Sequence, residues 1–511
     1  MDAATRNEEQ PLRRVINNHD GGAAELVRPA PPDWGRLVRE CIDVMADSHV
    51  DALFWGLGSG HTFQHDTRVG EFRGGNRDTF DSVQFWRVRE NSKALIREGH
   101  DILAGVVEEG HRIGLEVFAS LRMNDIHDSH YPERLSRLKT EHPEYLLGDS
   151  LEVYERGRAW KFSPQTAFNY AIPEVRAYKL AVIQETLDRY DVDGLELDWT
   201  RHGWAFRPGE ELENLGVMTE FTRQVRAHVD NASARRGRRL FLALSVPADL
   251  EDCRQIGLDV QTWLQDGLID ILVAAGTAFP PDLRPVRAAA RAAGCQLFAR
   301  LIKNPILARS PQVLRAAVAA WYYEGVDGIC LFNYYANPHE ALIDEIGEPE
   351  AIARGNKHYV VSQRSDPFPP YLHTVARPTA AGEPLPINLA LSSSGRGQVV
   401  PFAVADDLAS AAQEQTPPDI RLTVQLLNLC AEEDQLTFRL NGEPLPGPRA
   451  AEDGGVDCWL EFELPEGGAP VKQGENRLEV VLEKRNPAIT GSLVLSDVEL
   501  TVTYAGRPAS R

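Results

Sequence analysis

Apolar runs long enough for buried strands recur along the first 350 or so residues, and stretches with helical spacing of apolar positions lie between them. We expect eight strands, over residues 13–21, 50–58, 114–125, 192–199, 240–247, 269–276, 295–303 and 326–335. Strands that alternate with helices form a parallel sheet covered by helices. Eight such units are typical of a (β/α)8 TIM barrel, so the predicted fold class is α/β.

Two of the intervening helices carry clear end signals. Residues 173–190 begin with a proline in the first turn and place Leu180, Ile183, Leu187 and Tyr190 on one stripe. Residues 310–325 begin with Ser310 as N-cap and end at Gly325, a residue favoured where a helix stops. These helices should pack on the sheet before the fourth and eighth strands.

Four of the predicted strands begin with the same junction, an aliphatic residue followed by aspartate. The aspartates are Asp51, Asp193, Asp270 and Asp327. They fall at strand starts, the face of a barrel where side chains serve stability rather than catalysis. We therefore expect them to be structural.

The pattern changes after about residue 365. A proline-rich stretch is followed by short segments of alternating apolar and polar residues, and Asn441-Gly442 is a strong hairpin signal. We predict a barrel domain over residues 1–364, a connection over 365–385, and a β-sandwich, resembling a jelly roll, over 386–511. The sandwich would be an accessory module that binds carbohydrate or covers part of the barrel.

Composition is that of a soluble globular protein, with 43% hydrophobic and 25% charged residues among 511. No apolar run approaches the ~20 residues that cross a bilayer, so no membrane association is expected. The first residues lack the apolar core of a secretory signal, which favours a cytoplasmic location. The scattered cysteines are expected to be reduced and buried: Cys41, Cys253, Cys295, Cys330, Cys430 and Cys458.

The formal net charge of −21 repels phosphate backbones, so nucleic acid is not an expected partner. The same charge argues against a strongly anionic substrate unless a local basic pocket exists. It says little about a neutral one.

The segment DGLELDW, residues 193–199, carries the strongest chemical signal. Side chains alternate along a strand, so Glu196 and Asp198 share one face with Gly194 while the leucines and Trp199 share the other. The leucine face must meet the helices, and both carboxylates then point into the barrel. Asp198 falls at the carboxyl end of the strand, where barrel enzymes place catalytic groups.

DGLELDW, together with YDVDG before it and WLQDGLIDILV at residues 263–273, resembles the glycosyl-hydrolase-like family 10 barrels over most of residues 13–345. The resemblance implies a carbohydrate-active hydrolase with Asp198 as an essential carboxylate. Two more distant patterns fit less well. The chitinase family 18 signature would need an acid where Thr200 stands. The α-amylase fourth-strand pattern matches Asp198, Arg201 and His202, but Glu196 replaces its arginine.

Glu196 and Asp198 are stacked roughly 6.6 Å apart along the strand, so they do not face each other across a glycosidic bond. Glu196 is expected to position Asp198 or to have a raised pKa. The alternative is that both carboxylates pair with a buried cation such as Arg122 or Arg300.

The second catalytic carboxylate should therefore lie in a loop. Asp125, after the third strand, is our first candidate for the acid/base. Asp249 and Glu251 come next, although they are better explained as the cap of the following helix. Trp204 and Phe206 are expected to be exposed and to stack on sugar rings. The predicted substrate-binding residues are Arg122, Asn124, His127, Arg201, His202, Trp204, His61, Trp55, Asn333 and Tyr334.

Histidines follow the first four strands, at His19, His61, His65, His127, His130 and His202. Their spacing matches no common metal motif, so we predict neither a metal nor another cofactor. The leading hypothesis is a glycoside hydrolase acting on an oligo- or polysaccharide. The alternatives are a metal-dependent hydrolase using the histidine-rich rim and a non-catalytic carbohydrate-binding barrel. Formation of a homo-oligomer is left open.

Overall fold

The three-dimensional structure is a computed structural model. It describes residues 11–80, 82–129, 135–148, 164–275, 283–302, 310–333, 341–362, 385–392, 395–413, 417–453, 457–465 and 470–504.

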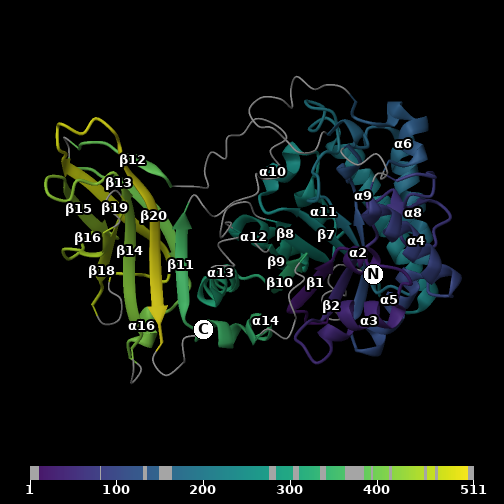
Figure 1. Ribbon diagram of the computed structural model, residues 1–511, viewed down its shortest axis with the longest axis horizontal. Coiled ribbons are helices and arrows are strands. Elements are labelled where there is room, and N and C mark those ends of the chain that lie inside the picture. Colours follow the sequence, from purple (N-terminus) through teal and green to yellow (C-terminus); the bar gives the residue numbers. More distant parts are fainter. Residues whose placement is uncertain are drawn as a thin grey trace.

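Eight parallel strands close into a barrel in the order β1-β10-β9-β8-β7-β6-β5-β2, which confirms the predicted TIM barrel (Figure 1). Each strand lies within one of the eight predicted segments. The strands are β1 (Val15–His19), β2 (Ala52–Gly56), β5 (Glu116–Arg122), β6 (Gly194–Asp198), β7 (Phe241–Pro247), β8 (Ile271–Ala275), β9 (Gln296–Ile302) and β10 (Gly328–Phe332).

Helices surround this barrel. The longer ones are α3 (Trp34–Cys41), α4 (Val83–Arg97), α5 (Ile102–Arg112), α8 (Pro173–Arg189), α9 (Leu215–Arg236), α12 (Arg284–Ala293) and α13 (Pro311–Glu324). Shorter elements are α2 (Ala23–Leu26), β3 (Thr62–Phe63), β4 (Glu71–Phe72), α6 (Arg137–Glu141), α10 (Leu250–Gln255), α11 (Val260–Gln265), α14 (Ala341–Ile346) and α15 (Pro349–Ala353).

The two predicted helices have the expected ends. Helix α8 starts at Pro173 and buries Ile183 and Leu187, while Leu180 is only partly buried. Helix α13 is capped by Ser310, whose side chain accepts a hydrogen bond from the Val313 amide, and it ends at Gly325 with φ 88°. A positive φ is what favours glycine at that position.

The four junction aspartates each tie the start of their strand to a neighbouring strand. The Asp51 carboxylate accepts from the Val15 amide, Asp193 from Val117, Asp270 from Leu242, and Asp327 from Leu297. Asp270 also binds Arg226 and Arg239. These contacts support the structural role expected from the sequence.

The barrel interior changes from apolar to polar along its axis. An apolar cluster including Phe54, Phe118 and Phe298 fills the lower part. Glu196 lies two residues above Gly194 on the same strand face, while Leu195 and Leu197 belong to the core between sheet and helices. The predicted orientation of strand β6 is therefore correct, and the polar side chains collect toward the carboxyl ends of the strands.

A β-sandwich follows the barrel, as predicted (Figure 1). One sheet has the order β11-β20-β14-β18-β17 with β12 also on β20, and the other has the order β13-β19-β15-β16. The elements are β11 (Lys357–Ser362), β12 (Ile387–Leu389), β13 (Gln398–Val404), α16 (Leu408–Ala411), β14 (Asp419–Leu427), β15 (Gln435–Leu440), β16 (Glu443–Pro444), β17 (Arg449–Asp453), β18 (Asp457–Glu463), β19 (Gly474–Lys484) and β20 (Leu493–Thr503).

The predicted hairpin turn lies between β15 and β16, with φ 54° at Asn441 and 90° at Gly442. Strand β11 precedes the predicted domain boundary at residue 364 yet pairs with β20 of the sandwich. Nearly all of the proline-rich connection over 365–385 lies outside the described residues.

Helix α13 lies between the two units (Figure 1). Its Ala316 belongs to the apolar core of the sandwich, whereas Ala317 and Val318 belong to the core of the barrel. Among the helices of the described residues, none is long and apolar enough to span a membrane. The six cysteines form no disulfide, and four of them are buried.

Candidate active site at the mouth of the barrel

Asp198 is the last residue of β6, and only one of its two carboxylate oxygens is fixed by hydrogen bonds from the described residues. Its Oδ1 accepts hydrogen bonds from the Thr200 amide (2.8 Å), the Thr200 hydroxyl (2.6 Å) and the Arg201 amide (3.1 Å). Within the described residues, Oδ2 has no hydrogen-bond partner. The turn after β6 therefore fixes the carboxylate plane and leaves one oxygen for a ligand.

Glu196 lies one layer deeper and is fully buried. Its Oε2 accepts from the side-chain Nδ2 of Asn18 at 2.8 Å, and its Oε1 accepts from the Ser245 hydroxyl at 2.5 Å. Burial and the neighbouring charge of Asp198 raise the pKa of Glu196 to about 7. The carboxyl group therefore keeps its proton to a much higher pH than an ordinary glutamate does.

The alternative that both carboxylates form ion pairs with a buried arginine is not what the described contacts show. Arg122 binds Asp125 through Nη1 at 3.0 Å and Asp20 through Nη2. Arg300 donates from Nη1 to the Thr200 hydroxyl instead. Both guanidiniums are still close enough to Asp198 to interact with it electrostatically.

Asp20 is a site residue that sequence reasoning missed. It follows β1 directly, and its side chain is 32% exposed, compared with 2% for Asp125 on the other side of Arg122. Position at a strand end was a usable signal, because the segment HDG at residues 19–21 has the same placement as Asp198.

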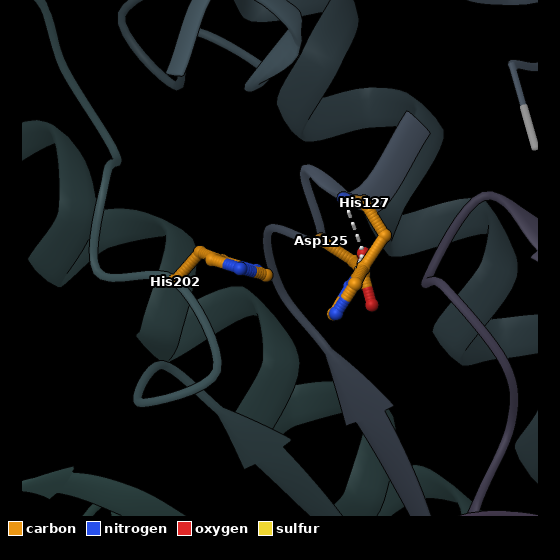
Figure 2. Close-up of side chains that lie close together, drawn as sticks. All are labelled: Asp125, His127 and His202. Atoms are coloured by element: carbon orange, nitrogen blue, oxygen red, sulfur yellow. Dashed lines mark hydrogen bonds and ion pairs between the residues drawn. The ribbon is translucent and has the colours of Figure 1, made fainter. Parts of the chain in front are cut away.

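Asp125, His127 and His202 come from two loops and point toward one another (Figure 2). The His127 ring approaches Asp125 Oδ1 with Nδ1 at 2.6 Å, and Arg201 Nη2 lies 3.1 Å from its Nε2. Arginine can only donate, so Nε2 accepts and Nδ1 carries the proton that is donated to Asp125. The contacts thus define the tautomer of His127.

The charges of this group follow from burial and contacts. Burial lowers the pKa of His127 and His202, so both rings are neutral near pH 7. For Asp125, burial by itself raises the pKa, but His127 and Arg122 outweigh it and hold the pKa well below its usual range. Asp125 is therefore ionised at all ordinary pH values.

The same three residues are the group that could hold a metal ion within the described residues, with ligand atoms within 4.8 Å of one another. However, Asp125 already binds Arg122 and His127, and the second ring nitrogen of His127 binds Arg201. A divalent cation would have to displace two guanidinium contacts and lie beside both positive charges. The arrangement fits a hydrogen-bonded network better than a resident cation.

Several predicted binding residues lie behind the site. Asn124 donates to the Phe168 carbonyl at 2.9 Å and accepts from the Phe168 amide, so it fixes a loop. His61 is 1% exposed and lies 3.2 Å from Asp128, itself bound to Lys139. Trp55 is 2% exposed and stacks on His19.

The prediction that Trp204 and Phe206 are exposed platforms is wrong. Trp204 is 9% exposed and packs with Ile126, Leu147 and Ala167, and Phe206 is 1% exposed. The loop after β6 folds back on the third-strand loop, which the local sequence does not reveal.

The remaining predicted residues cap a helix, follow a barrel strand or lie outside the described residues. Asp249 accepts from the amides of Glu251 and Asp252, so the helix-cap alternative is confirmed for it. Asn333 follows β10 and donates its amide to the Asn18 carbonyl at 3.0 Å. Tyr334 and His130 lie outside the described residues.

Fold and site together define a TIM-barrel protein with carboxylates and arginines at the carboxyl ends of its strands. Residues 80–232 match the family model described as glycosyl hydrolase-like 10. This match confirms, over that segment, the resemblance inferred from DGLELDW. No curated protein matches the sequence.

Solved structures with a similar fold include an α-L-fucosidase isoenzyme 2 from Paenibacillus thiaminolyticus, with 14% identity, a TM-score of 0.39, and coverage of 68% of this chain and 50% of the fucosidase. The PgaB (BpsB) glycoside hydrolase domain from Bordetella bronchiseptica has 13% identity, a TM-score of 0.40, and coverage of 66% and 98%. The GH36 α-galactosidase AgaA from Geobacillus stearothermophilus has 11% identity, a TM-score of 0.37, and coverage of 98% and 56%. The chain thus spans about half of the fucosidase and of the galactosidase.

Proposed function

We propose that the protein is a glycoside hydrolase that cleaves a glycosidic bond in an oligo- or polysaccharide, with Asp198 as nucleophile or general base. The observation that carries the proposal is the geometry of Asp198. One oxygen is held by three donors at the carboxyl end of β6, and the other has no partner in the described part of the chain. A carboxylate oriented in this way presents one oxygen in a fixed direction, which both roles require.

Asp125 is less suited to the acid/base role expected from the sequence. A general acid must hold a proton before it donates it, and the contacts of Asp125 with His127 and Arg122 favour the ionised form. We propose instead that Asp125 positions Arg122 and His127. Asp20, the more exposed carboxylate on Arg122, is then the candidate second carboxylate, because a substrate can reach it.

Glu196 is proposed to act through Asp198 rather than on the substrate. It is fully buried and bound by Asn18 and Ser245. In its protonated form it keeps a second negative charge away from Asp198. This role explains why two carboxylates are stacked on one strand.

The test is a screen of wild type and Asp198→Asn against aryl glycosides and plant, algal and microbial glycans, scored for released sugars with and without chelator. Removing an acid/base or nucleophilic carboxylate should lower kcat by roughly 10²- to 10⁴-fold. Asp249→Asn is the matched control, since it removes an exposed carboxylate that caps α10. Activity that Asp198→Asn retains would reject the proposal.

A metal-dependent hydrolase is the second candidate, and the observation that favours it is the Asp125, His127 and His202 group. Activity that chelator abolishes and zinc restores would select this candidate. Glycan binding without turnover, unchanged in Asp198→Asn, would instead indicate a non-catalytic carbohydrate-binding barrel.

A further inference from the structure

Three arginines converge on the mouth of the barrel. Arg122 ends β5, Arg201 follows β6, and Arg300 lies on β9 two residues above Phe298 of the barrel interior. Burial lowers the pKa of Arg122 and Arg300, and repulsion from Arg201 lowers both further. Like charges gathered in this way need anions to stabilise them.

The three guanidiniums are not equally compensated. Arg122 binds two carboxylates, Asp20 and Asp125. In the described part of the chain, no carboxylate oxygen lies within 4.0 Å of the Arg201 or the Arg300 guanidinium. Asp198 is the carboxylate with the strongest electrostatic effect on Arg300. Its Oδ1 is already bound by Thr200 and the Arg201 amide.

Arg201 and Arg300 use only some of their guanidinium N–H groups in the contacts that the described residues show. Arg201 donates from Nη2 to His127, while its Nε is buried without a hydrogen-bond partner in the described residues. Arg300 donates from Nη1 to Thr200, and its guanidinium carbon lies 4.5 Å from the centre of the Phe332 ring. A guanidinium offers five N–H donors in a planar fork.

Arginines at the opposite end of the barrel differ in this respect. Arg226 and Arg239 both bind the Asp270 carboxylate, and Arg238 binds Asp193. Each of these three arginines has an aspartate partner, which the described contacts do not give to Arg201 or Arg300.

We propose that Arg201 and Arg300 bind an anionic group of the substrate, so that the glycan carries a carboxylate or a sulfate ester on the sugar bound beside Asp198. The proposal rests on the proposed glycosidase function and names its substrate class. Planar guanidinium forks match the oxygens of such anions in two-point contacts. The arginines also supply the local positive charge that a chain of net charge −21 needs to accept an anionic ligand.

The first experiment compares pairs of aryl glycosides that differ only at C6, uronides against the corresponding neutral hexosides, and a third set carrying a 6-sulfate. We expect kcat/KM for one of the anionic series to exceed that for the neutral sugar by roughly tenfold or more, the value of one or two charge-assisted hydrogen bonds. The preferred series distinguishes carboxylate from sulfate. A preference for the neutral sugars would overturn the proposal.

Variants assign the effect to the two residues. Arg201→Gln and Arg300→Gln should lower kcat/KM for the anionic substrate, chiefly through KM, by about tenfold or more beyond any loss on the neutral analogue. Arg300→Lys keeps the charge without the fork and covers the case that Arg300→Gln fails to fold. Arg207→Gln, at an exposed arginine in the same loop, is the control. Equal losses on both substrates would show that the arginines only stabilise Asp198.

Binding separates this proposal from the proposed function. Calorimetry with free glucuronate, glucose and inorganic sulfate requires no turnover. If no glycoside is cleaved but glucuronate or sulfate binds wild type and not Arg201→Gln, the anion site stands and the glycosidase function fails. If neutral glycosides are cleaved and neither anion binds, the function stands and the anion site is rejected.

Discussion

The stacked pair of Glu196 and Asp198 links protonation to folding at a single residue. Glu196 has a pKa of about 7 in the folded protein, above its ordinary value of 4.5. Between these values the folded state binds more protons than the unfolded state, so stability falls as pH rises. The stabilisation is fully present below about pH 4.5 and is lost as pH rises through 7.

Glu196→Gln should therefore flatten the pH dependence of stability. The ionisation of wild-type Glu196 should cost on the order of 3 kcal/mol at alkaline pH, and the amide removes that cost. Urea unfolding of both proteins at pH 5 and pH 8 measures the difference. Parallel curves for wild type and variant would show that Glu196 ionises normally.

The two carboxylates on Arg122 should separate stability from activity. Asp125 is 2% exposed, so Asp125→Asn removes a buried ion-pair partner and should lower the free energy of unfolding by about 2–4 kcal/mol. Asp20 is 32% exposed, so Asp20→Asn should cost about 1 kcal/mol or less yet lower kcat. Chemical denaturation combined with kinetics on one substrate tests both, and the reverse pattern would make Asp125 the catalytic group.

At the scale of elements, the junction aspartates hold adjacent strands in register. Asp270→Ala would leave Arg226, Arg239 and the Leu242 amide without their shared partner. Breaking a buried pair in this way should cost about 3–5 kcal/mol. Asp249→Ala removes only a helix cap and should cost about 1 kcal/mol. Thermal unfolding of both variants tests this difference, and equal losses of stability in Asp270→Ala and Asp249→Ala would contradict it.

Across the whole molecule, strand β11 is the element that joins the two units. Tyr359 packs into the sandwich core and the next residue, Val360, packs into the barrel core, as expected for alternating faces of one strand. We therefore propose that the sandwich begins with β11, a few residues before the boundary predicted at 364.

Val360→Asp should uncouple the units, because a charge at a site 5% exposed costs about 2 kcal/mol or more. We expect calorimetry to resolve two transitions in this variant that overlap in wild type. Val69→Asp, the same change at a valine 39% exposed, is the control. A single transition unchanged in Val360→Asp would show that β11 does not carry the contact between the units.

Local sequence was sufficient for the eight barrel strands, the end residues of α8 and α13, the Asn441-Gly442 turn and the inward orientation of Glu196 and Asp198. Each depends on periodicity, on backbone preference or on hydrogen bonds close in sequence, so neighbouring residues determine it. The structural role of the four junction aspartates could be predicted from their position at strand starts, although their partners lie on neighbouring strands.

Only the tertiary structure decided which side chains meet at the mouth of the barrel. Asp20 reaches Arg122 across 102 residues, and Arg300 reaches Thr200 across 100. The burial of Trp204 and the engagement of Asp125 by His127 and Arg122 depend on how separate loops fold over one another. Such contacts arise when barrel closure brings distant strand ends together, and no local pattern encodes the pairings.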